Sequence, residues 1–113
     1  MTDELLLLAI CQKMYARKDP RFANFEYVGS ELGICLERGA RRGDYTTYWN
    51  PLRSMSQSFE LMVLFKIDVK HYEDHVVGWF DGGFIGTGRI PYGDNSLAAT
   101  MRAVAIAAAG SAE

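Results

Sequence analysis

Residues 67–80 read IDVKHYEDHVVGWF, and this stretch decides the fold class. Ile67, Val69 and His71 occupy alternate positions and share one face, which is the period of a β-strand. A turn follows, and residues 76–80 supply a second strand. The next residues, 81–83, read DGG and are typical of a hairpin turn that leads to a weaker strand at 84–88. The sequence therefore predicts a run of three strands in this half of the chain.

A helix is predicted on each side of this run of strands. Asn50 followed by Pro51 is a strong helix start, because Asn caps free amides and Pro at the first helical position loses no hydrogen bond. Apolar residues then recur at offsets of three and four and predict a stripe that faces a sheet: Leu52, Met55, Phe59 and Met62. The last helix has candidate caps at 94–96, a stop at Gly110, and its own apolar stripe of Leu97, Met101, Val104 and Ala108.

The N-terminal part of the chain predicts a helix, two strands and a loop. Acidic residues at its start and basic residues at its end place the helix at about Asp3 to Arg17. Its segment 5–10 is apolar on every side, so the helix either touches more than one neighbour or leaves leucines exposed. Residues 25–28 and 32–36 predict a strand pair. Glycines and charges then break the periodicity, and we expect an exposed loop up to Trp49.

Length and composition predict one globular domain covering residues 1–113. The chain has 113 residues, of which 49% are hydrophobic and 23% are charged. A chain of this size can bury a sizeable core without disulfide or metal staples. The predicted elements follow the order α, ββ, α, βββ, α, with no repeat and no linker between domains.

The charge balance and the apolar runs restrict the partners and the compartment. The net charge is −2 and the isoelectric point is about 5.7, which argues against direct nucleic-acid binding. Cys11 and Cys35 form no recognisable framework and fit reduced thiols. No run approaches the roughly 20 apolar residues that span a bilayer, and acidic residues precede the first apolar run. We therefore expect a cytoplasmic protein with no membrane partner.

No motif in the sequence predicts catalysis, a metal site or a cofactor. His71 and His75 flank two acids, but a strand running into a turn does not bring both imidazoles to one side, which favours a solvated hairpin end. The glycines of 82–88 fit no phosphate-binding pattern and favour a hairpin. No serine lies in a nucleophile motif, and no spacing selects a pair among the acids Asp68, Glu73, Asp74 and Asp81. We therefore expect a protein that is not an enzyme.

The best candidate for a partner-binding surface is the basic and aromatic segment 38–49. Arginine grips carboxylates or phosphates through two parallel bonds, and aromatic rings add contact area at little entropic cost. The candidate binding residues are Arg38, Arg41, Arg42, Tyr45 and Tyr48. Trp49, just before the predicted helix cap, has the alternative role of packing in the core. A secondary candidate surface is the acidic set of Glu73, Asp74 and Asp81.

Two segments resemble a family of small phage proteins. They are Asn50-Pro51, opening a helix that ends in LFKIDV at 64–69, and the ending DNSLAATMRAVAIAAA at 94–109. Both are similar to the phage ABA-sandwich domain and the related NinX proteins. The resemblance implies an α+β fold, an α/β/α sandwich of three helices around a mostly antiparallel sheet of four to five strands. It transfers no catalytic residue, and the basic segment after Leu36 departs from the family pattern.

The family's setting in phages and prophages implies a protein that interferes with host machinery. The leading hypothesis is a phage accessory protein that binds and blocks a host protein in the host cytoplasm. The target class would be a component of CRISPR or another defence system, as for an anti-CRISPR inhibitor. The alternative is a nucleotide or small-molecule binding protein that uses the glycines of 82–88 and an arginine. A third hypothesis is a homo-oligomer formed through exposed leucines of the first helix.

Overall fold

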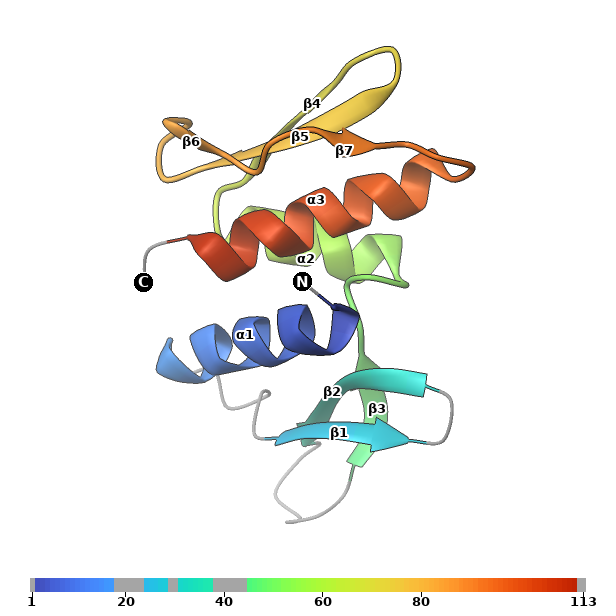
Figure 1. The fold of residues 1–113 in the computed structure, drawn as a ribbon. Coiled ribbons are helices and arrows are strands. Elements are labelled where there is room, and N and C mark those ends of the chain that lie inside the picture. Colours follow the sequence, from blue (N-terminus) through green and yellow to red (C-terminus); the bar gives the residue numbers. More distant parts are fainter. Residues whose placement is uncertain (1, 18–23, 29–30, 38–44, 112–113) are drawn as a thin grey trace. The chain divides into compact units, whose positions relative to one another are not determined.

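The computed structural model of the chain describes residues 2–17, 24–28, 31–37 and 45–111, with the backbone alone for residue 15 and for 24–28, 31–37 and 45–48. These residues form two compact units, Met1–Asn50 and Pro51–Ala112, which are described in turn. Within the described ranges the chain has three helices, and its C-terminal unit holds a four-stranded antiparallel sheet (Figure 1). The predicted α+β class is therefore confirmed, whereas the sandwich arrangement and the single domain stay predictions.

The N-terminal unit consists of one helix and a three-stranded antiparallel sheet. Helix α1 spans Asp3–Ala16, as predicted to within a residue. Strands β1 (Asn24–Val28) and β2 (Glu31–Glu37) form the predicted pair, and β3 (Tyr45–Trp49) lies on the other side of β2. The prediction of a loop up to Trp49 is wrong for this last segment. Its sequence YTTYW consists of residues that favour strands, and pairing with β2 outweighs the missing alternation.

Helix α1 buries one side and exposes the other. Leu6, Leu7, Ile10 and Met14 are almost fully buried, at the spacing of a helical stripe. Leu5 and Leu8 are exposed, which is the second of the two alternatives that the sequence left open. Cys11 is a buried free thiol, and burial raises its pKa, so that the thiol stays protonated at neutral pH.

The sheet of the C-terminal unit is built around its central strand β5 (His75–Phe80). Strand β4 (Asp68–His71) pairs with one edge of β5. Two short strands, β6 (Ile85–Gly86) and β7 (Ile90–Pro91), pair in succession with its other edge. Between them, Thr87 accepts a hydrogen bond from the Gly78 amide on its side-chain oxygen and donates its own amide to the Gly78 carbonyl. A single residue thus closes the gap between the two short strands.

Helix α2 (Met55–Leu64) differs from its prediction in start and orientation. Residues 51–53 form a turn, and the helix begins only at Met55 because the Ser54 side chain accepts a hydrogen bond from the Gln57 amide. The predicted buried stripe is wrong for Met55 and Phe59, which are 45% and 61% exposed. The buried side of the helix carries Ser58 and Leu61.

Helix α3 (Ser96–Gly110) packs against the sheet through small residues. Its cap is Asn95, one of the three predicted candidates, and it ends at the predicted Gly110. Val76 of the sheet forms a core cluster with Ala99 and Ala103, and a Cβ atom on Gly78 would lie 2.9 Å from the Ala103 carbonyl oxygen. The predicted stripe is buried except at its first member, because Leu97 lies in the first turn and is 59% exposed.

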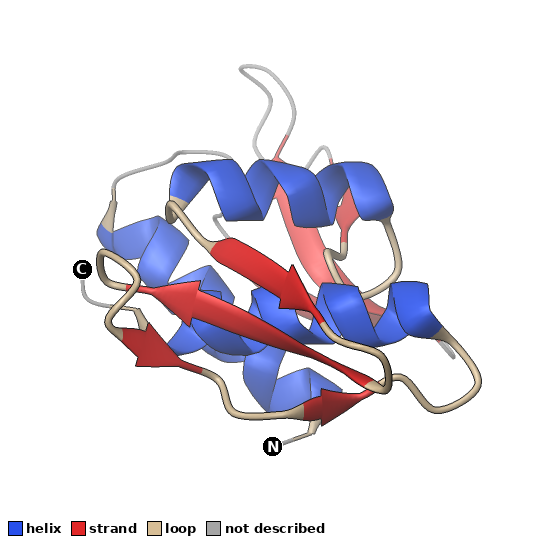
Figure 2. Cartoon of the chain, turned by 90° about the horizontal axis from the view of Figure 1, so that it is seen from above, coloured by secondary structure: helices blue, strands red, loops and turns tan. Residues whose placement is uncertain are grey.

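Both helices of the C-terminal unit lie on one side of its sheet (Figure 1). Figure 2 looks onto the opposite side, where the strands lie in front of the helices. We call this side the outer face, and the candidate site lies there. None of the helices in the described ranges has the length and apolar character needed to cross a membrane.

Candidate functional site

The outer face is defined by the alternation of residues along β4 and β5. Because Gly78 approaches the backbone of α3, its neighbours Val77 and Trp79 belong to the opposite side of the sheet. Cross-strand pairing sets Asp68 opposite Trp79 and Lys70 opposite Val77. The outer face therefore carries an aromatic ring, a carboxylate and an ammonium group next to one another.

Tyr72 and His75 form one end of this face, where β4 turns into β5. The Tyr72 amide donates a hydrogen bond to the His75 carbonyl oxygen at 2.8 Å, which closes the turn. Their rings stack, with centroids 4.5 Å apart and an interplanar angle of 8°. The Lys70 ammonium nitrogen lies 5.3 Å from the centroid of the Tyr72 ring, within the range of a cation–π interaction. Contacts with two neighbours therefore hold the Tyr72 ring in place.

Asp74 holds the His75 ring in its stack. Its Oδ1 atom lies 2.6 Å from Nδ1 of His75, and the exposed carboxylate accepts a hydrogen bond there. This hydrogen bond lowers the pKa of the Asp74 carboxyl below its ordinary value, and the positive charge of Arg89 adds to the shift. Asp74 therefore stays ionised at neutral pH, and it orients the imidazole on which Tyr72 stacks.

The Trp79 ring lies against the glycine of the neighbouring strand. A Cβ atom on Gly86 would lie 2.9 Å from the Trp79 ring, so the indole fills the space that a side chain would take. Glycine at this position lets the ring cover β6 and fixes its place on the outer face.

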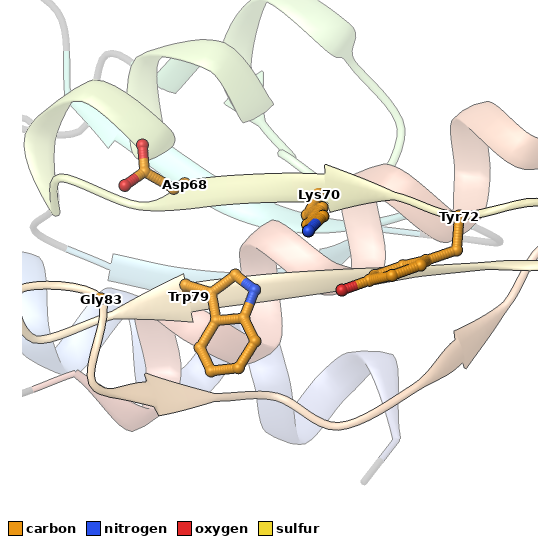
Figure 3. Close-up of a pocket in the computed structure, with 5 residues that line it drawn as sticks. All are labelled: Asp68, Lys70, Tyr72, Trp79 and Gly83. Atoms are coloured by element: carbon orange, nitrogen blue, oxygen red, sulfur yellow. The ribbon is translucent and has the colours of Figure 1, made fainter.

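Trp79, Tyr72 and Lys70 line an open hollow of about 330 Å³, together with Asp68 and Gly83. Figure 3 shows the indole nitrogen of Trp79 and the hydroxyl of Tyr72 directed toward each other, with the Lys70 nitrogen beside the gap between them. The Asp68 carboxylate lies at the border and points away from these groups (Figure 3). Three hydrogen-bond donors therefore face one space above the sheet.

Phe84 stands in the turn that follows β5 and precedes β6. Asp81, Gly82 and Gly83 all have positive φ, which produces a tight turn, and glycine adopts such angles without strain. The Phe84 side chain is 90% exposed. Because Gly83 lines the hollow, the turn places a fully accessible phenyl ring near its border.

The structure separates the acidic residues that the sequence grouped together. Glu73 and Asp74 lie in the turn before β5, and Asp81 lies in the turn after it. The length of β5 puts the two turns roughly 20 Å apart. The residues do not form one acidic patch, and each turn instead adds negative charge to one end of the sheet.

Arg38, Arg41 and Arg42, the basic residues of the predicted binding segment, lie outside the described residues. For Tyr45 and Tyr48 the structure gives the backbone, which pairs in β3 with Glu37 and Cys35. Their role in binding stays a prediction.

The structure does not bring His71 and His75 together. The His71 Nδ1 atom lies 2.9 Å from the hydroxyl oxygen of Tyr92, a residue that packs against the core cluster on the helix side of the sheet. His75 instead stacks on Tyr72. In the part of the chain that the structure describes, no group of three or more His, Cys, Asp or Glu residues is placed to hold a metal ion.

Sequence reasoning missed Lys70, Tyr72 and Trp79 as site residues. The signal was present, because Asp68, Lys70 and Tyr72 alternate with the apolar positions of the same strand. The apolar members of that alternation predicted only the buried face. The outer set follows from the same period of two.

No family model, no curated protein and no solved structure matches the chain.

Proposed function

We propose that this protein acts by binding another protein through the outer face and blocking that partner sterically. The partner is a host protein that belongs to CRISPR or another defence system, as the resemblance to phage proteins implies. The binding surface consists of Tyr72, Trp79 and Phe84 with the charged residues between them.

The exposure of aromatic side chains on the outer face and in the turn that follows β5 carries this proposal. Phe84 is 90% exposed and Tyr72 is 40% exposed, and Trp79 lines the hollow beside them. Tyrosine and tryptophan are enriched among residues that dominate binding energy, and grouped exposed apolar side chains typically mark interaction sites. Charged residues at the border of the face match the polar rim of protein interfaces.

The openness of the hollow favours a protein partner over a nucleotide or other small molecule. Pockets for small molecules usually enclose most of the ligand surface. This hollow lies on a sheet face and is open above Trp79 and Tyr72 (Figure 3). The glycines of 82–88 form a turn and short strand rather than a loop before a helix, so they lack the helix terminus that phosphate loops use.

The experiment is a cross-linking capture of host proteins with three matched variants. Phe84→Ser removes an exposed ring from the turn between β5 and β6, and Leu97→Ser removes an exposed leucine from the first turn of α3. Both leave stability within about 0.5 kcal/mol, because exposed positions contribute little to folding. A third variant, Arg41→Ala with Arg42→Ala, tests the segment predicted from the sequence.

We expect one host protein to be captured by the parent and by Leu97→Ser, with its affinity for Phe84→Ser lowered about thirtyfold. Equal capture by the parent and Phe84→Ser would contradict the outer face as binding surface. If only the double arginine variant lost the partner, the surface would be the basic segment instead. A small-molecule site would show as stabilisation by a nucleotide panel, which we do not expect.

A further inference from the structure

The donors in the hollow point to a specific chemistry for the partner, and this inference rests on the proposed function. We infer that the hollow binds a single carboxylate, carried by an aspartate or glutamate side chain of the partner protein, on Lys70, Tyr72 and Trp79. The ammonium group supplies the charge, and the hydroxyl and indole N–H groups supply the direction.

The first support is that the three donors have no hydrogen-bond acceptor within the part of the chain that the structure describes. Among the described residues, neither the Trp79 N–H nor the Tyr72 hydroxyl makes a hydrogen bond, and the Lys70 ammonium contacts only the face of the Tyr72 ring. Indole N–H groups donate only, and ammonium groups have no acceptor capacity, so the hollow is complementary to an acceptor with negative charge. The carboxylate of Asp68 points away from this space (Figure 3).

The second support is that the donors are held before any partner binds. The Trp79 ring rests on Gly86, and the Tyr72 ring contacts both His75 and Lys70. His75 is in turn held by Asp74. A site fixed in this way loses little conformational entropy on binding, which raises affinity without adding contacts.

The charges around the hollow decide between a carboxylate and a nucleic-acid backbone. Asp68 lies at its border, Glu73 and Asp74 occupy the turn at one end of the sheet, and Asp81 occupies the turn at the other end. A phosphodiester chain would place further negative charges along these acids, and strong nucleic-acid binding needs several positive contacts. One isolated carboxylate meets Lys70 and brings no further negative charge alongside these acids.

The test starts from a displayed library of random peptides selected on the full chain. We expect selected peptides to contain one essential acidic residue, and its change to glutamine or asparagine to weaken binding about tenfold. Lys70→Met, Tyr72→Phe and Trp79→Phe each remove one donor and keep an apolar side chain. When the same peptides are measured on Lys70→Met, the acid-to-amide change should cause little further loss of affinity, because the charge partner is already absent.

Two variants serve as matched controls. Arg53→Met removes a positive charge from the turn before α2, and Tyr92→Phe removes a hydroxyl from the helix side of the sheet. Neither should change peptide affinity. In a ¹⁵N-labelled sample, the indole N–H signal of Trp79 should shift on peptide addition while that of Trp49 stays, with Trp79→Phe assigning the two.

The outcomes separate the two proposals. Peptides that need Phe84 but no acidic residue would overturn the carboxylate site and leave the proposed function standing. Peptides that bind Phe84→Ser as well as the parent would contradict the proposed function itself. A thymidine oligonucleotide that displaces the peptides and depends on the same three donors would overturn the carboxylate in favour of phosphate.

Discussion

Gly78 and Gly86 lie on neighbouring strands, but an added methyl group would meet different obstacles at the two positions. On Gly78 it would lie 2.9 Å from a backbone oxygen of α3, which cannot move without shifting the helix. On Gly86 it would meet the Trp79 ring, which is a side chain and can turn away. We predict that Gly78→Ala destabilises the protein by about 1–3 kcal/mol, as overpacking does. Gly86→Ala should stay within about 1 kcal/mol of the parent.

Chemical denaturation of the two alanine variants measures these effects, and tryptophan fluorescence measures the second consequence. Gly86→Ala should change the emission of Trp79 in the native state, because the indole leaves its place on β6. Gly78→Ala should leave native emission nearly unchanged. Equal stability losses in both variants would show that the indole is as immobile as the helix backbone.

Asp74 makes the stability of the folded chain depend on pH in a predictable direction. Its pKa is lower in the folded chain than in the unfolded chain, because His75 donates a hydrogen bond to the ionised form. The stabilisation is therefore fully present above the unfolded pKa of about 4 and is lost as the pH falls through the folded value. We predict that Asp74→Asn flattens the acid limb of the stability curve below about pH 4. Thermal midpoints measured against pH check this, and parallel curves for parent and variant would contradict it.

At the scale of elements, helix caps give the clearest prediction. The Asn95 side chain accepts a hydrogen bond from the Ala98 amide at 3.0 Å and begins the helix that covers the sheet. We predict that Asn95→Ala costs about 1 kcal/mol of folding free energy, whereas Asn95→Asp costs little because aspartate also caps well. Urea unfolding gives both values. Loss of the same stability in the aspartate variant would mean that the amide group acts in another way.

The predictable elements were those with a strong local signal. The period of two at 67–80 and the flanking glycines placed β4, β5 and the turn to β6, and the charges at both ends placed α1. Strand β3 was missed because YTTYW shows no alternation and depends on pairing with β2. The start of α2 was missed because Ser54 competes with Asn50-Pro51 as a cap, and only the packing of the turn decides between them.

The candidate site was harder to predict than the fold. Tyr72, Lys70 and Trp79 come together only through the register that sets β4 against β5. A shift of one residue would exchange the two faces, so the neighbours of Trp79 are known only once the pairing of the strands is known. The arginines and tyrosines of 38–48 were selected by residue type. Residue type gives the chemistry of a side chain but not its position in the fold.

At the scale of the whole molecule, each compact unit carries one tryptophan. Trp49 is buried in the N-terminal unit, and Trp79 lies on the outer face of the C-terminal unit. The prediction of a single domain requires both units to unfold together. We expect Trp49→Phe and Trp79→Phe, each leaving one reporter, to show the same unfolding midpoint by fluorescence as by circular dichroism.

Two separate midpoints in either single-tryptophan variant would establish two domains instead. The comparison needs each variant to be checked for its own stability, since replacing the buried Trp49 removes packing volume. The circular dichroism midpoint of each variant serves as its reference. Only a difference between the fluorescence and circular dichroism midpoints of the same variant indicates two domains.

The two hydrogen bonds between Thr87 and Gly78 affect which changes in length the chain can accept. One threonine supplies both the acceptor and the donor that Gly78 requires, so β6 and β7 do not have to form one continuous strand. The segment between Thr87 and Ile90 is therefore released from strict length, and residues added there leave the sheet's hydrogen bonding intact. The border of the outer face can therefore change in length while the strands that carry Lys70, Tyr72 and Trp79 keep their pairing.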